Sequence, residues 1–291
     1  MKNIEIKISG ALSGKTVKEV LFGSLNLSAR LVTRLKQTGG IIVNGENVTV
    51  RKELHSGDIL IIAAADSCSA NIEPSDIPLD IIYEDEDILL VNKPAGMPVH
   101  PSFGHYGDTL ANAVMYRYKN QGFVFRAVSR IDKDTTGLVL IALNGFSADS
   151  LNRQMRERKI GKTYLAVCCG TPAIEKGRIE APIKRERDSV IKRIVSPDGQ
   201  YALTEYEVVS AGGNYSVIRA FPRTGRTHQI RVHMSYIGTP VYGDYIYGRE
   251  VPGEYMRLHC SSLQFVHPSS GKLMTFHAEP PEYFLSVPNI K

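Results

Sequence analysis

Short apolar runs separated by turn residues are the feature that most limits the folds open to this chain. From residue 79 onward they occur at 88–91, 124–128, 137–142, 164–167, 206–209 and 215–220. Runs of this length, rich in Val, Ile and Tyr, are typical of strands. Clear helical patterns occur only at about 108–118 and 146–158. Many strands with few helices predict an α+β domain built on a mixed, largely antiparallel sheet.

Residues 12–63 follow another pattern and predict a small α/β domain. A helix is expected to begin at the N-cap Ser28 and to end at the glycines 39–40, which favour a left-handed C-cap. In residues 41–48, Asn-Gly lies between two β-prone runs, the pattern of a two-residue hairpin turn. A buried strand is expected at 59–62.

Residues 64–78 are small, polar and interrupted by proline, which indicates a linker. A length of 291 residues also favours one large domain with a smaller companion. We therefore expect a small domain at 12–63, a linker at 64–78 and a larger domain at 79–291.

Composition narrows the class of protein. The chain is 43% hydrophobic and 22% charged, as in ordinary globular proteins. No stretch approaches the roughly 20 apolar residues that span a bilayer, and no signal peptide opens the chain, so we expect a cytoplasmic protein without membrane contact. Cys168 and Cys169 are adjacent and no C-x-x-C occurs, which favours reduced buried thiols over a metal site.

Positive charge is unevenly distributed. Residues 151–193 hold twelve Lys or Arg against five Asp or Glu, within a net charge of +5. Such a segment fits a surface that binds a polyanion, and it fits a solvated helix face equally well. Arg30 and Arg34, four residues apart, share one face of the second expected helix and leave the same two interpretations open.

Asp132 lies between two expected strands, in the segment Ser-Arg-Ile-Asp-Lys-Asp-Thr-Thr-Gly at 129–137. A loop held by strands on both sides is a good position for a catalytic group, and the neighbouring Arg130 and Lys133 favour an ionised carboxylate. From spacing alone, a turn-forming role for Asp132 and Asp134 is favoured instead.

Two further segments are rich in polar donors. Residues 224–233 read Thr-Gly-Arg-Thr-His-Gln-Ile-Arg-Val-His, and their arginines fit the binding of a phosphate or carboxylate. His228 and His233 lack a third ligand at a standard zinc spacing, so zinc is disfavoured. Tyr164 follows the basic stretch 158–162 and could stack on a base, or be an ordinary core aromatic of a strand.

In order and spacing, these segments resemble the RluA-type pseudouridine synthases. The family motif H-R-L-D-x-x-T-S-G is matched at 129–137, G-R-T-H-Q-[IL]-R-x-H at 225–233 and K-x-Y at 162–164. Further matches lie at 92–101, 243–248 and 258–260. The small domain resembles the S4 RNA-binding domain, through residues 27–30, 40–45 and 57–60.

The resemblance implies an enzyme that converts uridine to pseudouridine in structured RNA. It implies Asp132 as the catalytic aspartate, Arg231 as its partner and Tyr164 as the residue stacked on the target base. Arg130 would fill the space left by the flipped uridine. The remaining residues assigned to RNA binding are Arg30, Arg34, Lys93, Lys162, Arg226 and His228. For Lys93 and His228, a role in the architecture or in phosphate binding fits as well as a role in the chemistry.

The same resemblance implies no cofactor and a monomer whose partner is RNA, with ribosomal RNA of the large subunit favoured over transfer RNA. Ser129 stands where the family usually has histidine, Ile131 where it has leucine and Thr136 where it has serine. The serine keeps open a second interpretation, a catalytically silent RNA-binding or ribosome-assembly factor. A hydrolase using Ser or Cys is a third, although no G-x-S-x-G motif is present.

Overall fold

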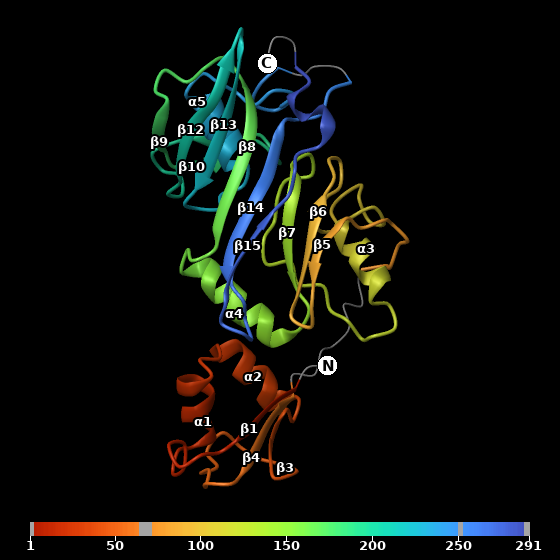
Figure 1. Cartoon of the computed structure of the whole chain (residues 1–291), viewed down its shortest axis with the longest axis vertical. Helices are drawn as coiled ribbons and strands as arrows, with labels where there is room; N and C mark the ends of the chain where they lie inside the picture. The colour runs from red at the N-terminus through yellow and green to blue at the C-terminus, as the bar shows by residue number, and fades with distance from the viewer. Residues whose placement is uncertain (1–2, 64–71, 250–252, 288–291) are drawn as a thin grey trace.

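The computed structural model describes residues 3–63, 72–249 and 253–287, which form a small N-terminal domain and a larger domain stacked along the long axis (Figure 1). Within these ranges, no helix is both long enough and apolar enough to cross a membrane. The helices are α1 (Val17–Glu19), the π-helical turn η1 (Val20–Ser24), α2 (Ala29–Gln37), α3 (Leu110–Arg117), α4 (Gly145–Arg156), α5 (Gln229–Tyr236) and the 3-10 turn η2 (Glu282–Leu285).

The small domain packs its helices on a four-stranded antiparallel sheet in the order β1-β4-β2-β3. Ser28 caps α2, because its Oγ accepts the Leu31 N–H at 3.2 Å. Asn44 and Gly45 have φ values of 51° and 87°, which confirms the expected hairpin turn. The strands are β1 (Asn3–Lys7), β2 (Ile41–Val43), β3 (Glu46–Asn47) and β4 (Ile59–Ala63).

The expected start of this domain, residue 12, is too late. Strand β1 pairs with β4 along its whole length, from Asn3 opposite Ala63 to Lys7 opposite Ile59. The strand is short and lies at the sheet edge, so its five residues gave no clear burial signal.

The large sheet confirms the mixed, largely antiparallel architecture. Its order is β5-β6-β7-β14-β8-β13-β12-β9, and β15 pairs with β14. Among the described strands, only β7 and β14 are parallel, with Thr136 opposite His259 and Gly137 opposite Cys260. The strands of this domain, including the separate pair β10–β11, are β5 (Ile81–Glu84), β6 (Ile88–Lys93), β7 (Thr136–Ala142), β8 (Gly161–Cys169), β9 (Lys176–Glu180), β10 (Ile183–Arg185), β11 (Arg193–Val195), β12 (Leu203–Gly212), β13 (Tyr215–Pro222), β14 (Leu258–Val266) and β15 (Leu273–His277).

Strand β7 is buried on both faces, because helices cover the sheet on each side. Leu138 and Leu140 belong to the core that includes residues of α4 and α5. Val139 and Ile141 point the other way, into the core under α3. This alternation follows from the pleat, and it places the start of β7 at the centre of the domain.

Two local predictions in the large domain are corrected. Residues 124–128 form an extended segment with an isolated bridge between Ala127 and Ile141, not a strand. Helix α5 was not predicted, because Gln, Arg, His and Ser residues interrupt its apolar positions and its N-cap, His228, makes no side-chain capping bond.

The described part of the expected linker is packed rather than extended. Ile72 and Ile77 contact the core under α3. The Ser75 N–H donates to the Asn112 carbonyl at 3.1 Å, and Asn112 Nδ2 donates to the Glu73 carbonyl at 2.6 Å. The described residues 72–78 of the expected linker therefore pack with the large domain. Residues 64–71, which include Cys68, lie outside the described residues.

Candidate active site

An open cleft of about 1510 Å³ runs from α2 of the small domain to the centre of the large sheet. Helix α4, the 130–135 loop, the start of β8 and the 224–231 segment also line it. Its lining is strongly basic, and the positively charged residues in it are Arg30, Arg34, Arg126, Arg130, Lys133, Arg156, Lys162, Arg226 and Arg231.

Asp132 occupies the first position of a tight turn on the wall of this cleft. The Thr135 N–H donates to the Asp132 carbonyl at 3.2 Å, and β7 begins at the next residue. On the other side, the Val128 N–H donates to the Leu140 carbonyl at 2.8 Å. Both interpretations of Asp132 are therefore compatible, because the turn fixes its backbone while its side chain, 25% exposed, remains accessible.

Arg231 connects Asp132 to a buried carboxylate. Its Nη1 donates to Asp132 Oδ2 at 3.0 Å, while Nε and Nη2 donate to the two oxygens of Asp244 at 2.7 and 2.8 Å. The side chains of Arg231 and Asp244 are 3% and 0% exposed. Burial lowers the pKa of Arg231, but Asp244 and Asp132 outweigh it and raise the pKa above its usual value. The guanidinium therefore stays charged and fixes the orientation of Asp132.

His228 approaches the same carboxylate oxygen. Its Nε2 lies 3.9 Å from Asp132 Oδ2, and its Nδ1 is hydrogen-bonded to the Tyr247 hydroxyl at 2.8 Å. That hydroxyl also accepts the Arg193 N–H at 2.8 Å, so Tyr247 fixes the orientation of the imidazole ring. Burial lowers the pKa of His228, which favours the neutral form.

Tyr164 lines the cleft beside Asp132 with its hydroxyl kept protonated. It lies on β8 between Ala220 of β13 and Cys260 of β14, and only 8% of it is exposed. Burial raises the pKa of Tyr164 well above its usual value, and Cys260 and Asp132 add to the effect. A neutral phenol at this position offers both a flat ring and a hydrogen-bond donor to a bound base.

Lys93 is placed differently from its expected RNA contact. It is 1% exposed at the end of β6, and its Nζ donates to the carbonyls of Pro94 and Lys133 at 2.7 and 2.8 Å. Burial lowers its pKa to about 7, although Asp134 and Asp132 oppose this. Of the roles left open for Lys93, the structure supports the architectural one, because Lys93 holds the turn that carries Asp132.

Ser129 also has a defined contact. Its side chain is buried, and its Oγ accepts the Leu140 N–H of β7 at 2.9 Å. Thr136 at the other end of the loop contacts His259 Nδ1 at 2.8 Å. Ser129 thus attaches the loop that carries Asp132 to the sheet through a small side chain.

The other residues assigned to RNA binding surround the cleft at different depths. Arg30 and Arg130 are exposed, and Lys162 is half-buried with its pKa lowered by burial. Arg226 is tied to the neighbouring segment, since it donates to the Tyr201 carbonyl and to Gln200 Oε1, both at 3.0 Å. The structure therefore brings residues far apart in sequence to one cleft, with Lys93 behind its wall.

Sequence reasoning missed two residues of the site, Asp244 and Tyr247. Both lie in the 243–248 segment, which was matched to the family without a role for either residue. Arg231 lies in a buried helix, and a buried guanidinium requires a carboxylate partner. That requirement is the signal that points to a residue such as Asp244. That partner comes from a separate loop, so its position could not be read from spacing.

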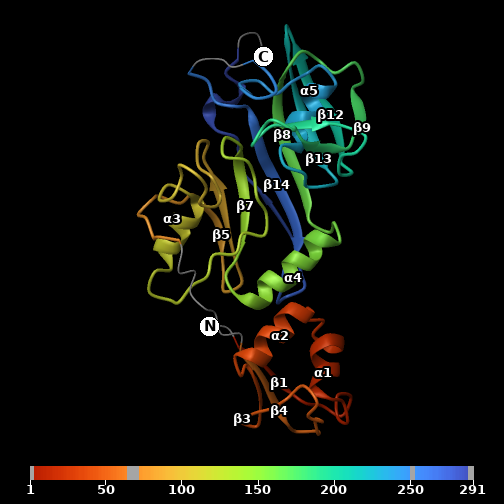
Figure 2. The ribbon, with the colours of Figure 1, turned by 180° about the vertical axis from the view of Figure 1, so that it is seen from behind.

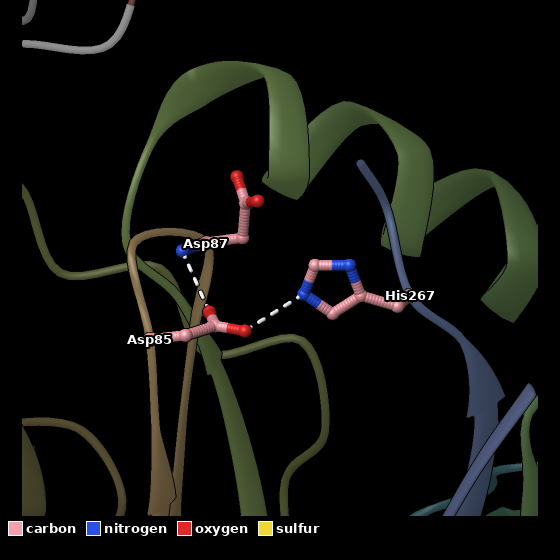
Figure 3. Close-up of side chains that lie close together, drawn as sticks. All are labelled: Asp85, Asp87 and His267. Atoms are coloured by element: carbon pink, nitrogen blue, oxygen red, sulfur yellow. Dashed lines mark hydrogen bonds and ion pairs between the residues drawn. The ribbon is translucent and has the colours of Figure 1, made fainter. Parts of the chain in front are cut away.

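Hydrogen bonds occupy the remaining histidines that could serve as metal ligands, His233 and His267. His233 contacts Thr204 Oγ1 and the Ala181 carbonyl, each at 2.9 Å, and so does not pair with His228. Asp85, Asp87 and His267 lie close together in Figure 3.

In this set, the Ser270 N–H donates to His267 Nδ1 at 3.1 Å, so Nε2 carries the proton that reaches Asp85 Oδ2 at 2.9 Å. The other oxygen of Asp85 accepts the N–H groups of Asp87 and Ile88 at 2.8 and 2.9 Å. We interpret the set as a structural hydrogen-bond network.

The buried thiols do not support a cysteine hydrolase. Burial raises the pKa of Cys168 far above its usual value and that of Cys260 to about 12. A thiol that remains protonated is a poor nucleophile.

Comparison with known proteins identifies the family. Residues 87–236 match the family model described as RNA pseudouridylate synthase. The RNA pseudouridine synthase YjbO of Bacillus subtilis is 40% identical over 273 residues, covering 92% of this chain and 96% of YjbO. The chain belongs to the RluA-type RNA pseudouridine synthases.

Two further relatives place this synthase more closely. The ribosomal large subunit pseudouridine synthase D of Zymomonas mobilis is 37% identical over 282 residues, covering 87% of the chain and 89% of that protein. The solved structure of human RNA pseudouridylate synthase domain containing 1 is 30% identical with a TM-score of 0.61, covering 74% and 88% of the two chains. The protein is therefore an RNA pseudouridine synthase, an isomerase, and its substrate is RNA.

Proposed function

We propose that this synthase isomerises specific uridines of structured large-subunit ribosomal RNA, with Asp132 as the catalytic group. The observation that carries the proposal is the ion pair of Asp132 with Arg231 at 3.0 Å on the wall of a basic cleft. A charged partner that is itself held by Asp244 keeps the carboxylate ionised and oriented before substrate arrives.

The reaction requires a group that acts on the base or sugar without being consumed. The C1′–N1 bond of uridine breaks, the base rotates, a C1′–C5 bond forms, and the proton at C5 is replaced by one at N1. Arg231 and His228 both approach Asp132 Oδ2, which leaves Oδ1 to face the uridine. Tyr164, kept neutral by burial, is placed to stack on the base and to donate a hydrogen bond.

The target base must leave its helix to reach Asp132, which costs a few kcal/mol. Arg130 is exposed beside Asp132 on the cleft wall, and its guanidinium fits the space that an extruded base leaves. Filling that space offsets part of the unstacking cost, since an arginine plane stacks on neighbouring bases.

The small domain is proposed to be of the S4 type and to bind the RNA away from the target. Arg30 and Arg34 on α2 line the same cleft as Asp132, which supports a continuous path for the phosphate backbone. The Zymomonas mobilis relative, which is named for the large ribosomal subunit, favours ribosomal RNA as that substrate.

The test is to incubate the purified synthase with unmodified transcripts of large-subunit ribosomal RNA and of transfer RNAs, and to map pseudouridine at nucleotide resolution. We expect product at defined uridines of the ribosomal transcript. Product in transfer RNA alone would contradict the substrate assignment. RNA binding with no product in either transcript would support the silent-factor alternative.

A further inference from the structure

We infer that helix α4 is a docking platform that fixes the small domain against the catalytic domain, with Asp149 as the positioning residue. The inference rests on the proposed function in one respect, because it assigns this docking to the recognition of RNA by Arg30 and Arg34. Figures 1 and 2 show α2 beside α4 from opposite sides.

One face of α4 carries the contacts to the small domain. Phe146, Asp149 and Arg153 are three and four residues apart and so share a face of the helix. Phe146, 9% exposed, belongs to the hydrophobic core of the small domain rather than to that of its own. Asp149 Oδ2 accepts the Ser28 N–H at 2.9 Å, and Arg153 donates to the Asn26 carbonyl.

Asp149 binds the N-terminus of α2 directly. Ser28 is the N-cap of that helix, and its own Oγ already accepts the Leu31 N–H. A carboxylate at a helix N-terminus is stabilised by the unpaired N–H groups and the helix dipole. Arg30 follows two residues later, so a bond at Ser28 sets the direction in which α2 presents its arginines to the cleft.

The opposite face of α4 fixes the helix to the catalytic domain. Ala148 and Leu151 belong to the core of that domain. Near the C-terminal end, Gln154 exchanges two hydrogen bonds with the backbone of Val266 on β14, at 2.7 and 2.9 Å. The helix therefore cannot shift toward the small domain without breaking its attachment to the sheet that holds the active site.

The N-terminal end of α4 is fixed by the network of Figure 3. Asp87 Oδ1 accepts bonds from Asn144, the N-cap of α4, at 2.9 Å and from Ser147 Oγ at 2.7 Å. Asp85 joins this network to His267 beyond β14. Because both ends of α4 are anchored, the helix fixes the distance between Arg30 and Asp132. The protein therefore selects RNA whose shape allows it to contact both residues at once.

The experiment compares Asp149→Ala with Asp149→Asn, which keeps an acceptor oxygen, and with Asp188→Ala, which removes an exposed carboxylate from the turn between β10 and β11. Steady-state kinetics are measured on the ribosomal transcript and on a short stem-loop that carries the same uridine. Small-angle scattering of the free protein reports the arrangement of the domains.

We expect Asp149→Ala to raise the radius of gyration and to raise KM for the long transcript about tenfold, the effect of losing one charge-assisted hydrogen bond. The kcat on both RNAs and the KM for the stem-loop should be unchanged. Asp149→Asn should restore most of the KM, and Asp188→Ala should match the wild type.

An unchanged radius of gyration and KM in Asp149→Ala would overturn the inference, as would an equal rise in KM for both RNAs. If the scattering changes while Arg30→Ala leaves KM for the long transcript unaltered, docking stands and the proposed RNA role of the small domain fails. If no ribosomal transcript is modified, the scattering arm still tests the docking alone.

Discussion

Arg231 holds the active site together because two carboxylates share its guanidinium. Asp244 binds it from the buried side and Asp132 from the cleft side. The pairing of Arg231 with Asp132 was expected from the family motifs. Asp244 was not expected, because a partner on a separate loop becomes visible only once the chain is folded. The burial of Lys93 behind the loop was hidden for the same reason.

Asp244→Asn is the first residue-scale prediction. The amide cannot accept two bonds from Arg231 and leaves part of a buried charge uncompensated, so we expect the free energy of unfolding to fall by about 3 kcal/mol. Because Arg231 then orients Asp132 less firmly, kcat should fall while KM for RNA stays near the wild-type value. Urea unfolding and steady-state kinetics measure the two effects, and an unchanged kcat would show that Asp132 needs no such support.

Lys93→Met is predicted to change how stability depends on pH. The folded-state pKa of Lys93, about 7, lies below its unfolded value, so between pH 7 and 10 the unfolded chain binds more protons. Lys93 therefore makes the wild type more stable as pH rises, by about 2 kcal/mol from pH 7 to 9, and less stable as pH falls. Methionine removes this contribution.

Urea unfolding of both proteins at pH 7 and pH 9 checks this prediction. The difference in unfolding free energy between wild type and Lys93→Met should move in favour of the wild type at pH 9. A difference that is constant with pH would contradict the assigned pKa.

Among the elements, β7 and its neighbours position Asp132, and most of these strands could be predicted from sequence. Apolar runs located β6, β7, β8, β12 and β13 because a doubly covered or half-buried strand needs such runs. Helix α5 was missed because its polar residues serve the site rather than the usual amphipathic pattern. The parallel contact of β7 with β14 joins residues more than a hundred positions apart, which no local pattern reports.

Gly137→Ala tests that parallel contact. Gly137 has a φ of 106°, and a methyl group there would overlap the Cys260 backbone on β14. The control Gly238→Ala has a φ of 82° and open space around the added methyl. We expect the control to cost about 1 to 2 kcal/mol from backbone strain, and Gly137→Ala to cost clearly more.

Thermal or urea unfolding of the two alanine variants gives the comparison. Equal losses of stability would mean that strain alone accounts for both, and that β14 does not press on the start of β7.

At the scale of the whole molecule, the two domains form one cleft rather than two independent binding units. The sequence predicted two domains and a basic surface, with few contacts between the two domains. The structure instead places Phe146 of the large domain in the core of the small one. Such contacts join surfaces that are distant in sequence. Within the basic segment 151–193, Arg153 lies at the domain interface, whereas Arg156 and Lys162 line the cleft.

The continuous cleft predicts how RNA affinity depends on salt. Each phosphate contact contributes about one unit to the slope of log affinity against log salt, slightly less for single strands. Arg30→Ala should reduce that slope by about one. Lys18→Ala, which removes an exposed lysine of the small domain outside the cleft, should leave it unchanged. Filter binding of the ribosomal transcript across a salt series measures both, and equal slopes for the two variants would contradict a specific RNA path over α2.

The assignment of Asp132 is tested most directly by Asp132→Asn under single-turnover conditions on the ribosomal transcript, with RNA binding measured in parallel. Asparagine keeps the size of the side chain and an acceptor for Arg231, so the turn and the cleft should be preserved. We predict that the variant binds the transcript within about threefold of the wild type, a difference below 1 kcal/mol, and forms no pseudouridine. Product formed at the wild-type rate would contradict the assignment of Asp132 as the catalytic group.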